Sequence, residues 1–176
     1  MTITEGYVEN GTNHPEIPLP AFGGPQSPVA RDICRGVVRV LAAHGLAAVA
    51  ELPLPNGRRA DVVGLGPDGM IWIVEIKSCL EDFRSDRKWP EYREFSDRLF
   101  FAVGVGFPCE ILPRDAGLIV ADRYGGEILR PAAEARLAAP KRKAMTLRLA
   151  RASAMRLSTL LDPTLPASVG RDISSA

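Results

Sequence analysis

The chain has 176 residues, of which 46% are apolar and 24% are charged, values that are ordinary for one globular domain. No apolar run is long enough to cross a membrane, and the first ten residues lack the basic and apolar parts of a signal peptide. Three widely spaced cysteines suit neither a disulfide framework nor a zinc site. We therefore expect a cytoplasmic protein with free thiols and no membrane partner.

The net charge is only +1, but the basic residues are concentrated near the C-terminus. Residues 135–161 hold seven Lys or Arg and no acid, whereas the rest of the chain holds 15 basic and 21 acidic side chains. This segregation favours phosphate binding by the segment, with a solvated basic face as the alternative. Of the 22 basic residues, 18 are Arg, so each of the four Lys marks a place where compact charge is preferred.

Pro-rich and Gly-rich composition predicts flexible tails at 1–27 and 162–176 around a single domain at 28–161. Apolar periodicity, turn residues and caps predict the following elements in chain order: a helix at 28–45, strands at 46–54, 59–65 and 70–77, a helix from residue 78, a short helix ending near 96, a strand at 98–105, a hairpin of 117–121 with 127–129, and a helix at 140–161. The early strands should form a meander, and the strand after the second helix should return to the same sheet. This order predicts an α/β sandwich around a mixed sheet.

Two local patterns refine the helices. Ser78 followed by Glu81 is a capping box, which predicts that the second helix starts there. The terminal helix places an apolar stripe at helical spacing, expected to pack on the core, at Leu147, Ala150, Ala154, Leu157 and Leu161. Its basic residues largely fall outside that stripe.

The loop between the second and third strands predicts how they pair. Pro67-Asp68-Gly69 suits a type I turn with a bulge at its glycine, which gives a three-residue loop. In the resulting register Asp61 lies directly opposite Glu75 on one face of the sheet, and Lys77 shares that face. A symmetric four-residue loop would put the two carboxylates on opposite faces, and the turn residues favour the first register.

Two carboxylates directly opposite one another repel, and a divalent cation between them removes that cost. Two carboxylates plus waters are the usual protein share of an Mg²⁺ site, and the backbone carbonyl of Ile76 is a candidate further ligand. Lys77 beside the metal can position an attacking water or neutralise charge on a phosphate. The pattern therefore predicts phosphodiester hydrolysis with Mg²⁺ or Mn²⁺ held by Asp61 and Glu75, and with Lys77 as the third catalytic residue.

A simpler interpretation stands beside this one, because a Glu-x-Lys pair at a strand end is commonly an ordinary surface ion pair. The derived register, the apolar strands around the three charges and the use of Lys in an Arg-rich chain favour the catalytic interpretation. Glu51 on the first strand is a further candidate metal ligand, with a solvated edge residue as the alternative.

The set Asp61, Glu75 and Lys77 in an α-β-β-β-α-β order resembles the PD-(D/E)xK nuclease superfamily. Ala60 stands where that pattern often has Pro. The run Lys88-Trp89-Pro90-Glu91-Tyr92 is similar in spacing to the Gln-x-x-x-Tyr element of RecB-type members, with Lys88 in place of Gln. The resemblance implies a restriction-endonuclease-like fold.

A longer stretch resembles the MmcB family of bacterial DNA repair proteins. The match runs over about residues 28–157, and its segments are 74–78, 82–92, 97–103, 117–122 and 142–147. The run Asp86-Arg87-Lys88-Trp89-Pro90-Glu91-Tyr92 is its most specific part. The resemblance implies a role in repair of DNA damage, with DNA and other repair proteins as partners and a place at the nucleoid.

Basic and aromatic side chains near the motif and on the terminal helix are candidates for holding DNA. The residues expected at this interface are Arg59, Lys88, Tyr92, Lys141, Arg142, Lys143 and Arg148. Contacts to phosphates give salt-dependent and mostly sequence-independent affinity. Tyr92 and Trp89 can stack on bases, although core packing is the favoured interpretation for Trp89.

The sequence thus favours a Mg²⁺- or Mn²⁺-dependent deoxyribonuclease in DNA repair. The alternative is a catalytically inactive DNA-binding or scaffold protein of the same fold, which would retain DNA without cleaving it. A third and weaker hypothesis is a protein-interaction module that uses its tails. A homodimer is a further expectation, since such nucleases commonly form one.

Overall fold

The structure is a computed structural model that describes residues 27–86 and 88–165. Its elements, in chain order, are α1 (Pro28–Ala43), β1 (Ala47–Pro53), β2 (Arg59–Leu65), β3 (Ile71–Lys77), α2 (Leu80–Ser85), the 3-10 helix η1 (Trp89–Phe95), β4 (Arg98–Val103), the 3-10 helix η2 (Cys109–Ile111), β5 (Gly117–Ala121), β6 (Gly126–Arg130) and α3 (Ala139–Leu161). This order confirms the predicted elements and adds η2. The predicted tails lie almost wholly outside the described residues.

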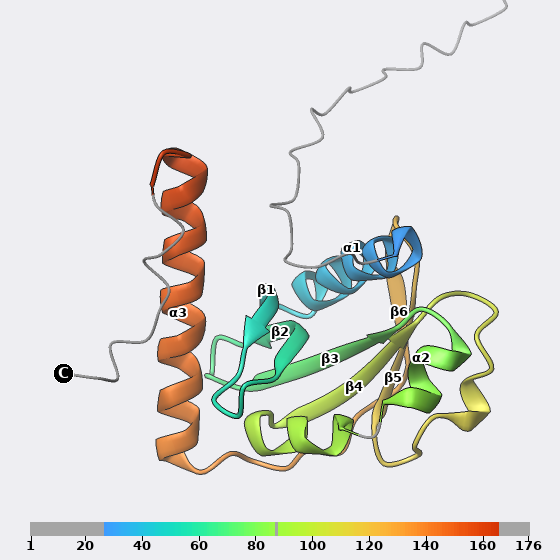
Figure 1. The fold of residues 1–176 in the computed structure, drawn as a ribbon. Coiled ribbons are helices and arrows are strands. Elements are labelled where there is room, and N and C mark those ends of the chain that lie inside the picture. Colours follow the sequence, from blue (N-terminus) through green and yellow to red (C-terminus); the bar gives the residue numbers. More distant parts are fainter. Residues whose placement is uncertain (1–26, 87, 166–176) are drawn as a thin grey trace, which may run out of the picture.

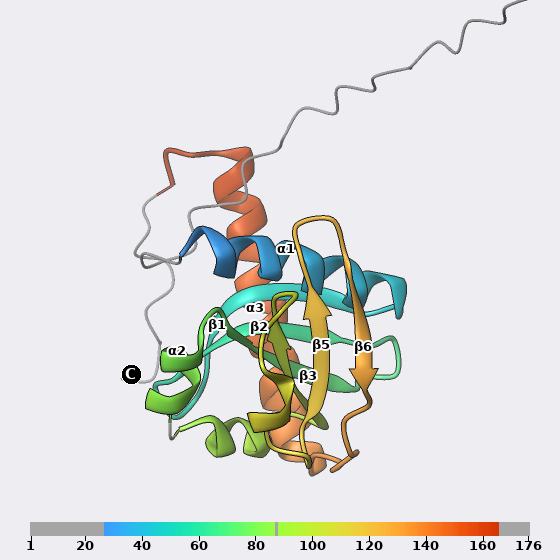
Figure 2. The same cartoon turned by 90° about the vertical axis from the view of Figure 1, so that its right-hand side faces the viewer.

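The six strands form one mixed sheet in the order β1-β2-β3-β4-β5-β6. The first three strands are an antiparallel meander, β4 and β5 run parallel to β3, and β6 returns antiparallel along β5. Figures 1 and 2 show α1 lying across one face of this sheet. On the other face η1 and α3 share an apolar cluster with β2 and β3, so the domain has three layers.

Helix α1 begins where its sequence predicts and ends two residues before the predicted Gly45. The Ser27 hydroxyl accepts a hydrogen bond from the Ala30 N–H at 3.1 Å, and Gly45 adopts a φ of 76° just beyond the last turn. Val37 and Leu41 are fully buried against the sheet. The α1 layer therefore covers the face of β3 opposite to Glu75 and Lys77, because successive side chains of a strand alternate between faces.

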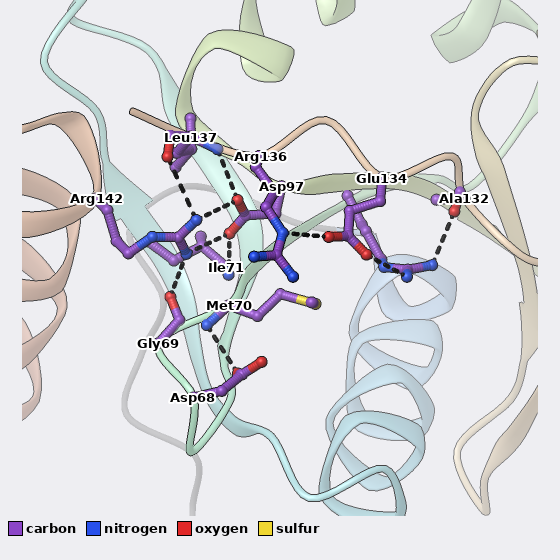
Figure 3. A network of polar contacts seen from close by, with 11 residues as sticks. Asp68, Gly69, Met70, Ile71, Asp97, Ala132, Glu134, Arg136, Leu137 and Arg142 are labelled. Carbon is purple, nitrogen blue, oxygen red and sulfur yellow. Dashed lines mark hydrogen bonds and ion pairs between the residues drawn. The ribbon is translucent and has the colours of Figure 1, made fainter. Parts of the chain in front are cut away.

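Asp97, directly before β4, joins several segments by hydrogen bonds on the face of the sheet opposite to α1 (Figure 3). Its carboxylate accepts hydrogen bonds from the Ile71 N–H at 2.7 Å and the Leu137 N–H at 2.8 Å. Both nitrogens of the Arg142 fork contact it at 2.7 Å, and the same guanidinium donates to the Gly69 carbonyl at 2.6 Å. Arg142 is therefore the ion-pair partner of Asp97. The network fixes the start of β3 against the start of α3.

Helix α3 packs through a different stripe from the predicted one. Met145 and Leu149 are buried, whereas Leu147 and Leu157 are more than half exposed. Two further arginines on the packed side explain this orientation, because Arg148 donates to the Pro53 carbonyl and Arg156 to the carbonyls of Ala50 and Glu51. The guanidinium groups hold the Met145 side of the helix against β1, and the predicted stripe faces away from the sheet.

The predicted capping box is absent. Helix α2 begins at Leu80 with Cys79 as its N-cap, and no side chain caps it. The Ser78 N–H instead lies 3.3 Å from a carboxylate oxygen of Asp82, which replaces the predicted contact with Glu81. All three cysteines are free, as predicted. Within residues 27–86 and 88–165, no helix is long and apolar enough to span a membrane.

Candidate active site

The β2–β3 hairpin has the register that its turn predicts. Val62 pairs with Val74, and Leu65 pairs with Ile71. Gly69 has a φ of 80°, which is the left-handed conformation that the bulge requires. Asp61 is therefore the next residue opposite Glu75.

Beyond Val62 and Val74, side chains replace the backbone ladder between the two strands. The Ile76 N–H donates to the Asp61 carboxylate at 2.7 Å, and the Asp61 N–H donates to the Glu75 carboxylate at 3.4 Å. Each carboxylate thus accepts a hydrogen bond from the backbone of the opposite strand. This exchange holds the two acidic groups side by side at the end of the hairpin.

Burial makes the two negative charges unfavourable. Glu75 is 3% exposed, and burial together with the nearby Asp61 raises its pKa well above the usual value for Glu. Burial also raises the pKa of Asp61 to about 6, although the Ile76 N–H and the positive charge of Lys77 act in the opposite direction. A buried and a half-buried carboxylate, both with raised pKa values, form a place where a cation is electrostatically favoured.

Lys77 lies on the same face and is charged. Its side chain is 5% exposed and its ammonium contacts the Asp86 carboxylate at 2.6 Å. Burial alone would lower the pKa of Lys77, but Asp86, Glu75 and Asp82 together raise it. The same ion pair lowers the pKa of Asp86 despite its partial burial. The sequence predictions give Asp86 no role at the site, and its one signal is its place at the start of the run 86–92 that resembles the MmcB family.

Glu51 is also buried, next to Asp61. In β1 the pairs Ala50–Val62 and Leu52–Ala60 flank it, so it lies across from Asp61, whose pKa its charge helps to raise. Its φ of 51° is strained for a residue with a side chain. Arg59 forms an ion pair with it, and Arg156 binds its backbone carbonyl. A solvated edge position, the alternative interpretation of Glu51, is therefore wrong.

The acidic residues can supply only a few of the ligands that a metal ion needs. Among residues 27–86 and 88–165, no three His, Cys, Asp or Glu side chains form a group that could hold a metal ion. Mg²⁺ commonly takes one or two carboxylates and completes its shell with waters and substrate oxygens. Asp61 and Glu75 match that share, because they are adjacent, buried and disfavoured as uncompensated anions. The role of the Ile76 carbonyl stays a prediction.

The residues predicted to hold DNA fall into two groups. Arg59, Lys88, Lys141 and Lys143 are exposed. Arg142 and Arg148 donate to acceptors within the fold. Tyr92 is 7% exposed, and its hydroxyl donates to the Arg59 carbonyl at 3.3 Å. Trp89 packs edge-on against Phe101 with ring centroids 5.3 Å apart, in agreement with core packing.

These observations define an α/β domain with the predicted α-β-β-β-α-β core and with the half-buried Asp61 and the buried Glu75 beside a buried lysine. Residues 18–164 match the family described as DNA repair protein MmcB-like, and the chain belongs to that family. A solved structure of the SPO1766 protein of unknown function from Silicibacter pomeroyi is 43% identical, covering 86% of this chain and 100% of that chain with a TM-score of 0.75. No curated protein matches the sequence. Family membership supports a role in DNA repair.

Proposed function

We propose that the chain is a divalent-metal-dependent deoxyribonuclease that acts in DNA repair. The observation that carries this proposal is the arrangement at the end of the β2–β3 hairpin, where Asp61 and Glu75 lie opposite one another with Lys77 on the same face. Three charges gathered in a largely apolar part of the sheet cost stability. A reaction that uses them accounts for their presence together.

Each of these residues has a distinct role. Asp61 and Glu75 would hold Mg²⁺ or Mn²⁺, which when bound polarises a phosphate oxygen and lowers the pKa of a coordinated water. The Lys77 ammonium neutralises negative charge on the phosphoryl oxygens as the phosphodiester reacts. Asp86 is a positioning residue, because its ion pair keeps Lys77 charged and fixes the ammonium beside the carboxylates.

Two exposed cations border the candidate active site and supply DNA contacts. Arg59 begins β2 two residues before Asp61, and its side chain is about half exposed. Lys88 is exposed, and its backbone N–H donates to Asp86 at 2.8 Å, which places it one contact away from Lys77. Lys141 and Lys143 extend the basic surface along the first turns of α3. These side chains give affinity for phosphates without reading sequence.

The same site also supports a second candidate function, a DNA-binding or scaffold protein without catalysis. The observation in its favour is that the Lys77 ammonium is already neutralised by Asp86 at 2.6 Å. A lysine held in this way has less charge to offer a phosphate. In this alternative the carboxylates and Lys77 form a buried structural network, and DNA is retained by the basic surface alone.

The deciding experiment is cleavage of end-labelled single-stranded, duplex and branched DNA with Mg²⁺ or Mn²⁺, with binding measured on the same substrates. We expect cleavage by the wild type, at least 100-fold slower cleavage by Asp61→Asn and Lys77→Ala, and binding within threefold for both variants. Glu81→Gln, which neutralises an exposed acid on α2, is the matched control and should cleave normally. Binding without cleavage by the wild type on every substrate would favour the scaffold function.

A second readout separates metal binding from catalysis. Mg²⁺ or Mn²⁺ should raise the melting temperature of the wild type, since a ligand that binds only the folded protein stabilises it. The shift should be smaller in Asp61→Asn and Glu75→Gln and unchanged in Glu81→Gln. Equal shifts in all four proteins would place the metal elsewhere.

A further inference from the structure

Helix α3 carries a large share of the exposed apolar surface. Ten large apolar side chains are exposed in the part of the chain that the structure describes, and five of them lie at or after residue 147. Leu147 is 55% exposed, Leu157 57% and Leu161 79%. Figure 1 shows α3 standing at one side of the molecule beside β1, with its last turns extending past the sheet. Solvent-exposed leucines gathered on one helix indicate an interaction surface.

These leucines follow a strict spacing. The positions are three and four residues apart in alternation, which is the heptad spacing of a coiled-coil seam, and they are Leu147, Ala150, Ala154, Leu157 and Leu161. We call this set the outer seam. The opposite side of the helix carries Met145 and Leu149, which pack on the domain, and Arg156, which binds the β1 carbonyls. The outer seam is therefore a second contact side, separate from the packed one.

We propose that the outer seam pairs with the outer seam of a second copy of this chain, with the two α3 helices antiparallel. The sequence of the seam reads the same in both directions over its first four positions, Leu-Ala-Ala-Leu. A two-fold axis midway along this stretch sets Leu147 against Leu157 of the second copy, and Ala150 against Ala154. Large side chains then meet at both ends, and alanines let the helices approach closely in the middle. Such self-complementarity is what a two-fold interface requires.

Charge selects the antiparallel arrangement. Lys143 lies seven residues before Ala150 and so continues the outer seam toward the N-terminus of α3. Parallel helices in register would place Lys143 against its own copy, which is repulsive. Antiparallel helices place it beside the C-terminal end of the second α3, where Asp162 is exposed and the helix dipole is negative. Each dimer contains this attraction twice.

The surroundings of the seam contain one unfavourable contact. Arg151 flanks the seam next to the two-fold axis, so the antiparallel register brings it near Arg151 of the second copy, one exposed like-charge contact against the two Lys143–Asp162 attractions. The two domains lie on the outside of the helix pair, because each packs on the opposite side of its own α3. The proposal does not rest on the nuclease function, since Asp61, Glu75 and Lys77 lie outside the outer seam, and of the proposed DNA contacts it involves Lys143 alone.

Sedimentation equilibrium of the full chain without DNA, over a range of protein concentrations, tests the proposal. We expect a monomer–dimer equilibrium for the wild type. Leu157→Glu and Leu147→Glu should each weaken dimerisation at least tenfold, because both substitutions act at two symmetric contacts. Leu129→Glu on β6, where the leucine is 56% exposed, is the matched control and should dimerise as the wild type does. Far-UV circular dichroism of every variant checks that it folds.

A charge exchange tests the orientation. Lys143→Glu and Asp162→Lys should each weaken the dimer about fivefold, and the double variant should restore it, because the attraction is re-formed with the signs reversed. A wild type that is monomeric at every concentration would overturn the proposal. A dimer that Leu147→Glu and Leu157→Glu leave intact would also overturn it, since the interface would then lie elsewhere. Failure of the double variant to recover would overturn the antiparallel arrangement.

Discussion

The ammonium of Lys77 lies 2.6 Å from the carboxylate of Asp86, and almost nothing of the lysine side chain is exposed. The pair joins the end of β3 to the turn after α2, two segments whose geometry is otherwise set by a few contacts. Because the lysine is buried, its charge depends on the acidic groups around it, of which Asp86 alone is in direct contact. This pair is therefore both a structural link and the means by which Lys77 remains positive.

Replacing one member of the Lys77–Asp86 pair should lower the free energy of unfolding more than replacing both members. Asp86→Asn leaves a buried ammonium without its contact, and we expect it to lower the free energy of unfolding by about 2–4 kcal/mol. The double variant Lys77→Met with Asp86→Asn should lose less than the single variant. Urea unfolding of the two single variants and the double variant measures the coupling. An additive result would show that the ion pair contributes nothing to stability.

Asp61→Asn should stabilise the protein at neutral pH. Burial raises the pKa of Asp61 to about 6, so the folded state holds this proton more tightly than the unfolded chain does. The stability associated with the protonated group is present below the ordinary pKa near 4 and is lost as the pH rises through about 6. Asparagine removes that loss and still accepts from the Ile76 N–H. We expect a gain of about 1–3 kcal/mol at pH 7.5.

Thermal unfolding without metal at pH 4.5 and pH 7.5 measures how the stability gain from Asp61→Asn depends on pH. The gain from Asp61→Asn should be largest at the higher pH and clearly smaller at the lower one, where the carboxyl is protonated in the folded wild type but still largely ionised in the unfolded chain. Glu81→Gln is the control, because that side chain is exposed on α2, and its effect should be small at both values. A gain of equal size at both pH values would contradict the electrostatic explanation.

Asp97 should show the opposite dependence on pH. Burial alone would raise its pKa, but Arg142 and the N–H groups of Ile71 and Leu137 outweigh burial, so the pKa lies below its ordinary value. Its stabilising effect is therefore present above the ordinary pKa near 4 and is lost as the pH falls through the lower folded value. Asp97→Asn should cost about 2–4 kcal/mol at pH 7. Asp115→Asn, which affects an exposed ion pair with Arg93, should cost less than about 1 kcal/mol.

Unfolding measured between pH 3 and pH 7 separates these two aspartates. The difference between wild type and Asp97→Asn should shrink as the pH falls, whereas Asp115→Asn should track the wild type throughout. A constant difference would show that the Asn side chain fails for steric reasons and that charge plays little part.

The conservative substitution Arg156→Lys should destabilise the protein, because a lysine cannot make the contacts of the arginine. The guanidinium reaches two successive carbonyls, Ala50 and Glu51, at the strained position in β1, whereas an ammonium is a single compact donor group. We expect Arg156→Ala and Arg156→Lys each to cost about 1–2 kcal/mol. Arg151→Lys on the exposed side of α3 should be neutral. Hydrogen exchange should be faster along β1 near Glu51 in both Arg156 variants.

If the basic surface holds DNA, affinity should fall steeply as salt increases. Lys88→Ala and Lys141→Ala should each lower the slope of log K against log salt by about 1, because each removes one phosphate contact. Arg123→Ala is the matched control, since this exposed arginine faces Asp32 of α1, away from the candidate active site. A slope that is the same in all four proteins would place the DNA elsewhere.

The fold and the carboxylate pair could be predicted because local rules decide them. The Pro67-Asp68-Gly69 turn fixes the hairpin register, and the register alone brings Asp61 opposite Glu75. The roles of the arginines on α3 could not be predicted in the same way. Three of these arginines donate to acceptors that are 45 or more residues distant in sequence, and they are Arg142, Arg148 and Arg156. Helical periodicity gives no information about contacts between such distant residues.

The same limit explains the inverted orientation of α3. Its outer seam has the more regular apolar spacing, so periodicity assigns that side to the core. The structure buries Met145 and Leu149 instead, because the arginines on their side find carbonyls and Asp97. Part of the basic bias of residues 135–161 is therefore structural and does not require a nucleic-acid ligand.

The exchange of hydrogen bonds between Asp61 and Glu75 has a consequence for folding. Slippage of β2 by one residue against β3 would turn the Asp61 side chain to the other face relative to Glu75, and both hydrogen bonds between the two segments would be lost. The two acids therefore penalise a one-residue slip of the hairpin, and the chemistry of the site and the accuracy of strand alignment depend on the same two residues.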